Sequence, residues 1–294
     1  MKPTLRLIWA LLIILLYQQT VCGKPDNFTF SPIIPQTEYF SNRMAGSLLQ
    51  DSRGYLWAGS LDGLIRYDGT EFVSFDKTDL HTASSAVCCI FEDSVGNLWI
   101  GTEKGLSRFS IATGTFDAID TSSSVIDSKV ACVREDNSGR IWFSLKSKGI
   151  WSYDPVSGNF EHYLYDPEDG NAAPKINSFI IDDNGNVIIS VYCDGLYICR
   201  DGFESVEPLE VSGFDFAGDD FSCMTAGERN IIYAVSGNLG LCEILPYAGK
   251  VKVLTGLDRG VHATDLYNDG VRGMLYMSTT RGLYALNLTD GGRC

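Results

Sequence analysis

The sequence predicts an all-β fold that is built by repeating one unit of four short strands. One phrase returns six times: an aspartate or its substitute, a tight turn, an aromatic or aliphatic residue, a small residue, then Gly and an aliphatic residue. The clearest copies span residues 51–64 and 93–106. The pivotal glycines are 42 to 46 residues apart and lie at Gly63, Gly105, Gly149, Gly195, Gly240 and Gly282. A period of this length, composed only of short strands and turns, is typical of a β-propeller with four-stranded blades.

The first half of each repeat reads as a hairpin of two strands. A residue that tolerates positive φ lies three positions before the strand residue that is usually aromatic, as a tight turn requires. This residue is Gly54, Gly96, Gly139, Gly185, Asn230 or Gly273. The position two after the aromatic residue is small in five copies, which suits sheets that pack face to face about 10 Å apart. Those positions are Gly59, Gly101, Ser144, Ser190 and Ser278, with Val235 in the fifth copy.

The second half of each repeat predicts a third strand and an outer strand. After the pivotal glycine comes an aliphatic residue and an alternating strand, and a second turn leads to the outer strand. We expect the outer strands to open at Phe72, Phe116, Phe160, Phe203 and Val251. The inner strands are expected at residues 44–50, 87–92, 130–135, 176–181, 221–226 and 264–268.

The repeat resembles a known family. The pattern Asp-x-x-Gly-x-Leu-Trp-x-Gly-[Ser/Thr]-x-x-Gly-Leu-x-Arg-[Tyr/Phe] is similar to the two-component regulator propeller repeat, and the copies cover about residues 44 to 288. The match is close around Trp57 and Trp99, good around Trp142, and looser around Ile188, Tyr233 and Tyr276. The resemblance implies the periplasmic sensor region of a Bacteroides-type hybrid histidine kinase.

The N-terminus predicts export. Lys2 and Arg6 precede an eleven-residue apolar run, which is shorter than the roughly 20 residues of a membrane-spanning helix, and small residues follow. We therefore expect a signal peptide at residues 1–23, a propeller sensor domain at 24–294 and a periplasmic location. Lipid attachment at Cys22 is the alternative, but the preceding Gln19-Thr20-Val21 does not favour it. Cleavage after Gly23 changes the net charge from −14 to −16, which argues against nucleic acid as a partner.

Motifs for catalysis, cofactors and metals do not stand out. The three histidines, His81, His162 and His262, are expected in loops between blades, and no Cys-x-x-Cys pair is present. The cysteines read as small buried apolar residues. The repeated Asp51, Asp93, Asp136 and Asp182 lie beside turns, where aspartate commonly accepts backbone N–H bonds. No phosphate-binding loop, kinase region or receiver domain follows, so the sequence predicts neither an enzyme nor a cofactor.

A binding site is expected on the face that carries the long loops between blades. The loops between second and third strands should lie on this same face, and their residues vary while the frame stays constant. These residues are Asp62, Lys104, Lys148, Asp194, Leu239 and Arg281. His162, Tyr163, Tyr165 and Tyr192 could add stacking surfaces for sugar rings. Sugar as the ligand depends mostly on the resemblance, and the acidic composition favours a neutral or cationic oligosaccharide.

Three functions remain open at this point. The first is a sensor that binds an oligosaccharide and relays a signal to downstream signalling domains or a homodimer partner. The second is a propeller-fold polysaccharide lyase or glycosidase, and the third is a protein-interaction scaffold. We favour the sensor.

The ends of the chain raise the question of ring closure. The sixth repeat reaches a turn at residues 290–292 with only two residues left, so its outer strand is missing. Residues 27–34 have the pattern of an outer strand without a blade of its own, and could close a six-bladed ring by pairing with the last blade. The alternative is a seven-bladed ring that is truncated here. We expect closure or near closure, as a fragment of a longer sensor.

Overall fold

A computed structural model describes residues 47–119, 126–164, 173–200, 203–257 and 261–288. Within these ranges the chain is nearly all β, with only two single turns of 3-10 helix at Glu228–Asn230 and Pro246–Ala248. The strands form six antiparallel sheets, here called blades 1 to 6. The first three blades are β1(Ser47–Gln50) β2(Leu56–Gly59) β3(Leu64–Tyr67) β4(Phe72–Phe75), β5(Val87–Glu92) β6(Asn97–Thr102) β7(Gly105–Ser110) β8(Thr115–Ala118), and β9(Val130–Glu135) β10(Ile141–Leu145) β11(Ile150–Tyr153) β12(Phe160–Tyr163). The other three are β13(Ile176–Ile181) β14(Val187–Val191) β15(Gly195–Arg200) β16(Ser205–Pro208), β17(Phe221–Ala226) β18(Ile232–Ser236) β19(Gly240–Leu245) β20(Lys250–Thr255), and β21(Ala263–Asp269) β22(Met274–Thr279) β23(Gly282–Asn287).

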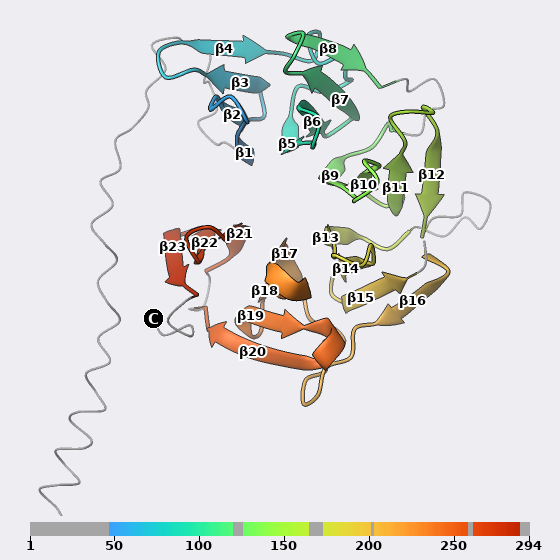
Figure 1. Ribbon diagram of the computed structural model, residues 1–294, viewed down its shortest axis with the longest axis vertical. Coiled ribbons are helices and arrows are strands. Elements are labelled where there is room, and N and C mark those ends of the chain that lie inside the picture. Colours follow the sequence, from blue (N-terminus) through green and yellow to red (C-terminus); the bar gives the residue numbers. More distant parts are fainter. Residues whose placement is uncertain (1–46, 120–125, 165–172, 201–202, 258–260, 289–294) are drawn as a thin grey trace, which may run out of the picture.

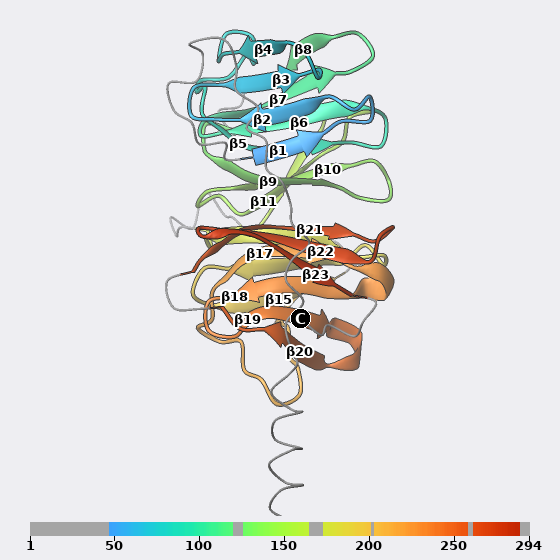
Figure 2. The ribbon, with the colours of Figure 1, turned by 90° about the vertical axis from the view of Figure 1, so that its left-hand side faces the viewer.

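The blades are arranged as a ring, so the fold is a six-bladed β-propeller. Figure 1 shows the first strand of each blade next to the centre and the last strand at the perimeter. Figure 2 shows the same blades from the side of the ring. The predicted fold class is therefore confirmed. Blade 6 has three strands in the described part of the chain, and the others have four.

Apolar clusters between successive blades hold the ring together. Each of the five clusters of buried residues joins two neighbouring blades. Blades 1 and 2 share a cluster that includes the fully buried Trp57 and Leu98. The blades approach closely because of the small residue in each second strand: a Cβ atom on Gly101 would lie only 2.5 Å from Cys89 Sγ and 2.8 Å from Val130 Cγ1 of blade 3. In blade 4 the equivalent Ser190 donates a hydrogen bond to the Phe221 carbonyl of blade 5 at 2.7 Å.

The repeated aspartates stabilise the turn between the first two strands. In blade 2 the buried Asp93 carboxylate accepts the indole N–H of Trp99 at 2.8 Å and the backbone N–H groups of Val95 and Asn97. Asp51 with Trp57 and Asp136 with Trp142 repeat this arrangement at 2.8 and 2.7 Å. The repetition predicts the role of the aspartate at the turn, and the structure adds its bond to the tryptophan six residues later.

The strand bounds follow the sequence closely, with two differences. Four inner strands match the expected residues, at 87–92, 130–135, 176–181 and 221–226. The fourth outer strand begins at Ser205 rather than Phe203, because Phe203 has φ 71° and its ring stacks on Trp142 and Tyr163 of blade 3 instead. His162 is also not in a loop: it lies on β12, opposite Trp151.

Blades 1 and 6 meet differently from the other neighbours. The inner strands pack against one another from β1 to β21 in order, whereas β21 and β1 share no comparable contact, and no apolar cluster joins these blades within the described ranges. Large apolar side chains are exposed on their strands instead, at Leu48, Leu56, Tyr267, Leu283 and Tyr284. Residues 27–34, which are expected to pair with the last blade, lie outside the described residues, so closure stays a prediction.

Deletion of residues 24–36 is expected to lower the melting temperature by about 5 °C or more, because main-chain pairing to blade 6 would be lost along with cover for the exposed apolar side chains. Differential scanning calorimetry of the mature chain checks this. A variant in which a Gly/Ser linker of equal length replaces the segment controls for length. An unchanged melting temperature would show that this segment does not close the ring.

Candidate functional site

The loops that were expected to share one face do so. The loop between second and third strands of a blade is hydrogen bonded to the segment that enters an inner strand: Glu103 N–H to Ala86 O, Lys146 N–H to Lys129 O and Tyr192 N–H to Lys175 O, at 2.9, 2.9 and 2.8 Å. These bonds fix the loops against the inner strands. We call this side of the ring the long-loop face, and the side with the aspartate turns the opposite face.

A pocket on the long-loop face lies where the inner strands of blades 3, 4 and 5 begin, near the centre of the ring (Figure 1). Its volume is about 470 Å³, within the range of small-molecule sites. The lining residues come from three inner strands and two adjoining loops. They are Lys129, Ala131, Lys146, Lys175, Ile176, Asn177, Tyr192, Asp220 and Ser222. We call this site the central pocket.

The charge of the central pocket is opposite to that of the chain. Three lysines and one aspartate line it, whereas the whole chain has a net charge of −14. Lys129 pairs with Glu103 just outside the lining, at 2.7 Å, and this hydrogen bond raises the pKa of Lys129 and lowers that of Glu103. Lys146 and Lys175 form no ion pair with any described residue. Two ammonium groups are thus available to a ligand.

Tyr192 gives the central pocket an aromatic wall. Its side chain is half exposed, and the Lys175 ammonium lies 5.4 Å from the centre of the ring. Its neighbours Cys193 and Asp220 raise the pKa of the phenol. Asp220 accepts the Asn177 amide N–H at 2.6 Å, which orders two polar groups beside the ring. An exposed aromatic face beside fixed hydrogen-bonding groups can bind a sugar ring.

Most of the residues predicted for the site are spread around the rim. Tyr192 is the one that lines the central pocket. Asp62 and Asp194 line two separate hollows in blades 1 and 4, and Asp194 accepts the Tyr197 hydroxyl at 2.8 Å. Lys104 lies 3.9 Å from Asp127. Lys148, Leu239 and Arg281 also lie in turns, as expected, but line none of these three hollows.

The aromatic residues expected from the third long loop do not form a sugar platform at the centre. The His162 ring stacks on Trp151, with 4.9 Å between centroids, on the outer strand of blade 3. Tyr163 ends the same strand and stacks on Trp142 and Phe203. The Tyr163 ring therefore packs between blades 3 and 4, whereas the His162 ring is exposed and stacks within blade 3. Tyr165 is outside the described residues.

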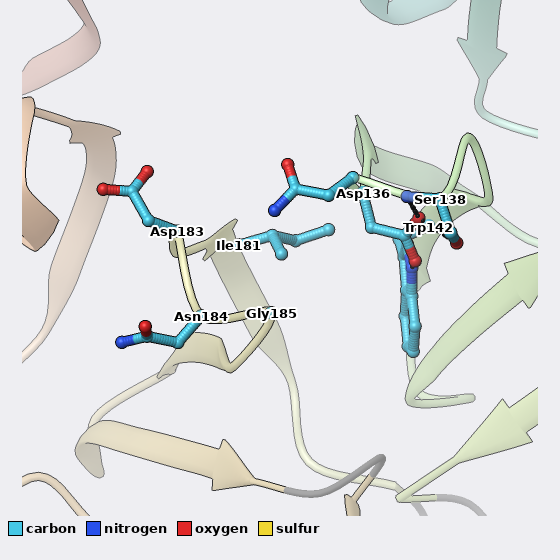
Figure 3. Close-up of a pocket in the computed structure, with 8 residues that line it drawn as sticks. Asp136, Ser138, Trp142, Ile181, Asp183, Asn184 and Gly185 are labelled. Atoms are coloured by element: carbon cyan, nitrogen blue, oxygen red, sulfur yellow. Dashed lines mark hydrogen bonds between the residues drawn. The ribbon is translucent and has the colours of Figure 1, made fainter.

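A further hollow, here called the second hollow, lies on the opposite face, between blades 3 and 4. Elsewhere a glutamate of the next blade accepts a backbone N–H from the aspartate turn, as Glu92 does from Ser52 and Glu135 from Ser94. Here the equivalent residue is Ile181, which cannot accept, and a hollow of about 270 Å³ remains. Figure 3 shows Asp136 bonded to Ser138 beside Trp142, with Ile181, Asp183 and Asn184 across the hollow.

This second hollow is a weaker candidate for ligand binding. The Asp136 carboxylate already accepts hydrogen bonds from Ser138, Arg140 and Trp142. Burial alone would raise the pKa of Asp136, but these bonds outweigh it and hold the pKa below its ordinary value. The carboxylate therefore serves the turn, and the central pocket offers more uncommitted polar groups.

Sequence reasoning missed the lysines of the central pocket, although a signal was present. Lys129 and Lys175 occupy the same place in successive repeats, immediately before the first apolar residue of the inner strand. Comparing that place across repeats would have set both beside the loop residues Lys146 and Tyr192. The residues just before the pivotal glycines, which the sequence pattern favours, lie on a different part of the rim.

The described residues show no sign of metal, membrane or thiol chemistry at the site. No group of three or more His, Cys, Asp or Glu side chains is placed to hold a metal ion there, and no helix there is long and apolar enough to cross a membrane. Cys132, Cys199, Cys223 and Cys242 are buried, as the sequence predicts for small apolar residues, while Cys193 is exposed. Burial raises the pKa of Cys199 and Cys223 to about 12. Buried thiols of this kind are inert.

Comparisons with known proteins agree with the fold. Residues 83–104 match the family model of the two component regulator propeller. Two extracellular domains from B. thetaiotaomicron, both assigned to hybrid two component systems, are similar in structure: that of BT3049 has 20% identity and a TM-score of 0.70, with 85% of this chain and 34% of that one covered. That of BT4673 has 22% identity and a TM-score of 0.67, with 83% and 35% covered. The chain therefore spans about a third of the length of these domains.

An enzyme shares the fold as well. Virginiamycin B lyase from Staphylococcus aureus is 12% identical, with a TM-score of 0.61 and coverage of 81% of this chain and 82% of that one. No curated protein sequence is significantly similar to the chain. The match over residues 83–104 and the six-bladed ring agree with the two-component regulator propeller repeat that the sequence resembles.

Proposed function

We propose that the chain is the ligand-binding propeller of an extracytoplasmic sensor, and that it recognises an oligosaccharide in the central pocket. The observation that carries this proposal is the pocket itself: an exposed tyrosine face with fixed polar groups at the centre of the ring. The similar domains of hybrid two component systems support the sensor class. Relay to signalling domains, and the periplasmic location and signal peptide, are part of the same proposal.

The pocket is well placed to pass on a binding event. It is lined by residues of blades 3, 4 and 5, so one ligand would contact three blades at once. Ligand binding can change the packing of blades only as far as it favours one arrangement over another. Because the blades meet through apolar clusters, small shifts at the centre would be carried to the perimeter through those clusters.

Isothermal titration calorimetry with a panel of neutral and acidic oligosaccharides tests this proposal. We expect at least one to bind, and Tyr192→Ala to weaken that binding about tenfold or more, because aromatic contact area is lost. Tyr284→Ala is the matched control, since Tyr284 is similarly exposed but lies on β23 outside the pocket.

Three outcomes would overturn the proposal. Binding of no oligosaccharide, or binding that ignores Tyr192→Ala, would favour a protein-interaction scaffold. Cleavage of a panel member, detected by chromatography of the products, would favour a propeller-fold enzyme instead.

A further inference from the structure

We infer that the ligand of the central pocket is an anionic sugar, an oligosaccharide that carries a carboxylate or sulfate group. This inference rests on the proposed function and adds the chemical class of the ligand. It differs from the neutral or cationic ligand that the overall composition favours. The local arrangement of charge decides the matter, because a ligand responds most strongly to groups within about one Debye length.

The central pocket carries a surplus of positive charge. Lys129, Lys146 and Lys175 line one pocket in a chain with 23 basic and 37 acidic residues. The backbone bond from Lys146 to Lys129 fixes two of these lysines within blade 3, and the bond from Tyr192 to Lys175 fixes the third within blade 4. The positions are thus built into the rim of the ring rather than scattered on a mobile surface.

Two of the three lysines form no ion pair within the described residues, although Lys146 lies close enough to Glu103 to help lower the pKa of that carboxyl. Lys146 and Lys175 have no carboxylate within ion-pairing distance among the described residues, although acidic residues outnumber basic ones in the chain. The one carboxylate that lines the pocket, Asp220, is engaged by the Asn177 amide. An incoming carboxylate or sulfate would gain charge-assisted hydrogen bonds without displacing an existing partner of these two lysines.

The aromatic ring of Tyr192 lies beside the lysines. Lys175 lies over the Tyr192 ring at 5.4 Å, so an anion bound by Lys175 would bring its own sugar ring next to the tyrosine. Asn177 and Ser222 line the same pocket and can bond to sugar hydroxyls. This combination suits a ring that carries both hydroxyls and one negative charge, as in a hexuronate or a sulfated sugar.

Calorimetric titration with two matched pairs of probes tests the inference. The first pair is trigalacturonate and the same trisaccharide with its carboxylates reduced to alcohols, and the second is a chondroitin sulfate tetrasaccharide and its desulfated form. We expect an acidic probe to bind at least about tenfold more tightly than its neutral or desulfated counterpart. The trigalacturonate pair reports on carboxylate, and the chondroitin pair on sulfate. Binding should weaken as salt is raised.

Variants make the test specific to the pocket. Lys146→Gln and Lys175→Gln should each weaken the acidic probe about tenfold while the melting temperature stays unchanged. Lys250→Gln removes the same charge at an exposed position on β20 outside the pocket, and should leave binding unchanged.

The outcomes separate this inference from the proposed function. If a neutral probe binds as tightly as the acidic one and depends on Tyr192 but not on the lysines, the sensor stands and the anionic ligand is wrong. If no probe binds, or if Lys250→Gln weakens binding as much as Lys175→Gln does, the central pocket is not an anionic sugar site. If no oligosaccharide of either class binds, the proposed function fails as well.

Discussion

Asp93→Ala is expected to lower the free energy of unfolding by about 3 kcal/mol or more. The carboxylate accepts the Trp99 indole N–H at 2.8 Å, the Asn97 backbone N–H at 2.7 Å and the Asn97 amide at 2.9 Å. Trp99 is fully buried, so its N–H would be left without an acceptor in an apolar interface. Urea unfolding followed by fluorescence measures the change.

Asp68→Ala is the matched control for that experiment. Asp68 also caps a turn, where it accepts three hydrogen bonds from Thr70 and Glu71 that lower its pKa to about 2, but it is exposed. Water can replace those bonds, so the loss of stability should be much smaller than at position 93. A loss at position 93 no larger than at position 68 would contradict the structural role of the Asp93 and Trp99 pair.

Gly101→Val is expected to destabilise the ring by about 3 kcal/mol through steric overlap. A Cβ atom there would come within 3 Å of both Cys89 and Val130, and Val130 belongs to the next blade. Blades 2 and 3 would have to move apart, which exposes part of their shared apolar cluster. Differential scanning calorimetry should show a lower melting temperature.

Gly270→Val controls for the backbone effect of losing a glycine. Nothing lies within 4 Å of a Cβ at Gly270, and its φ is one that other residues adopt. We expect a change of about 0.5 kcal/mol or less there. If both substitutions cost the same, close blade packing is not the reason for the small residue at position 101.

Much of the fold follows from local residue patterns. The inner strands at 87–92, 130–135, 176–181 and 221–226 lie where the repeat predicts them, because short-range alternation and turn glycines specify them. The capping role of Asp93 was also predictable, since an aspartate that recurs at one place in four of the six repeats belongs to the frame. Its bond to the tryptophan six residues later was not, because it depends on how the side chain is packed.

The sequence by itself determined that this chain repeats a four-stranded unit six times and which face carries the long loops. Tertiary structure alone decided the composition of the site. Lys129, Lys146 and Lys175 are far apart in the chain, yet the ring brings equal places of successive repeats to one rim. Phe203 reads as the start of a strand but packs against Trp142 of the neighbouring blade. His162 reads as a loop residue but lies on a strand, where it stacks on Trp151 of the same blade. Local sequence patterns fix the strands and turns, whereas the contacts between blades depend on how the blades pack in space.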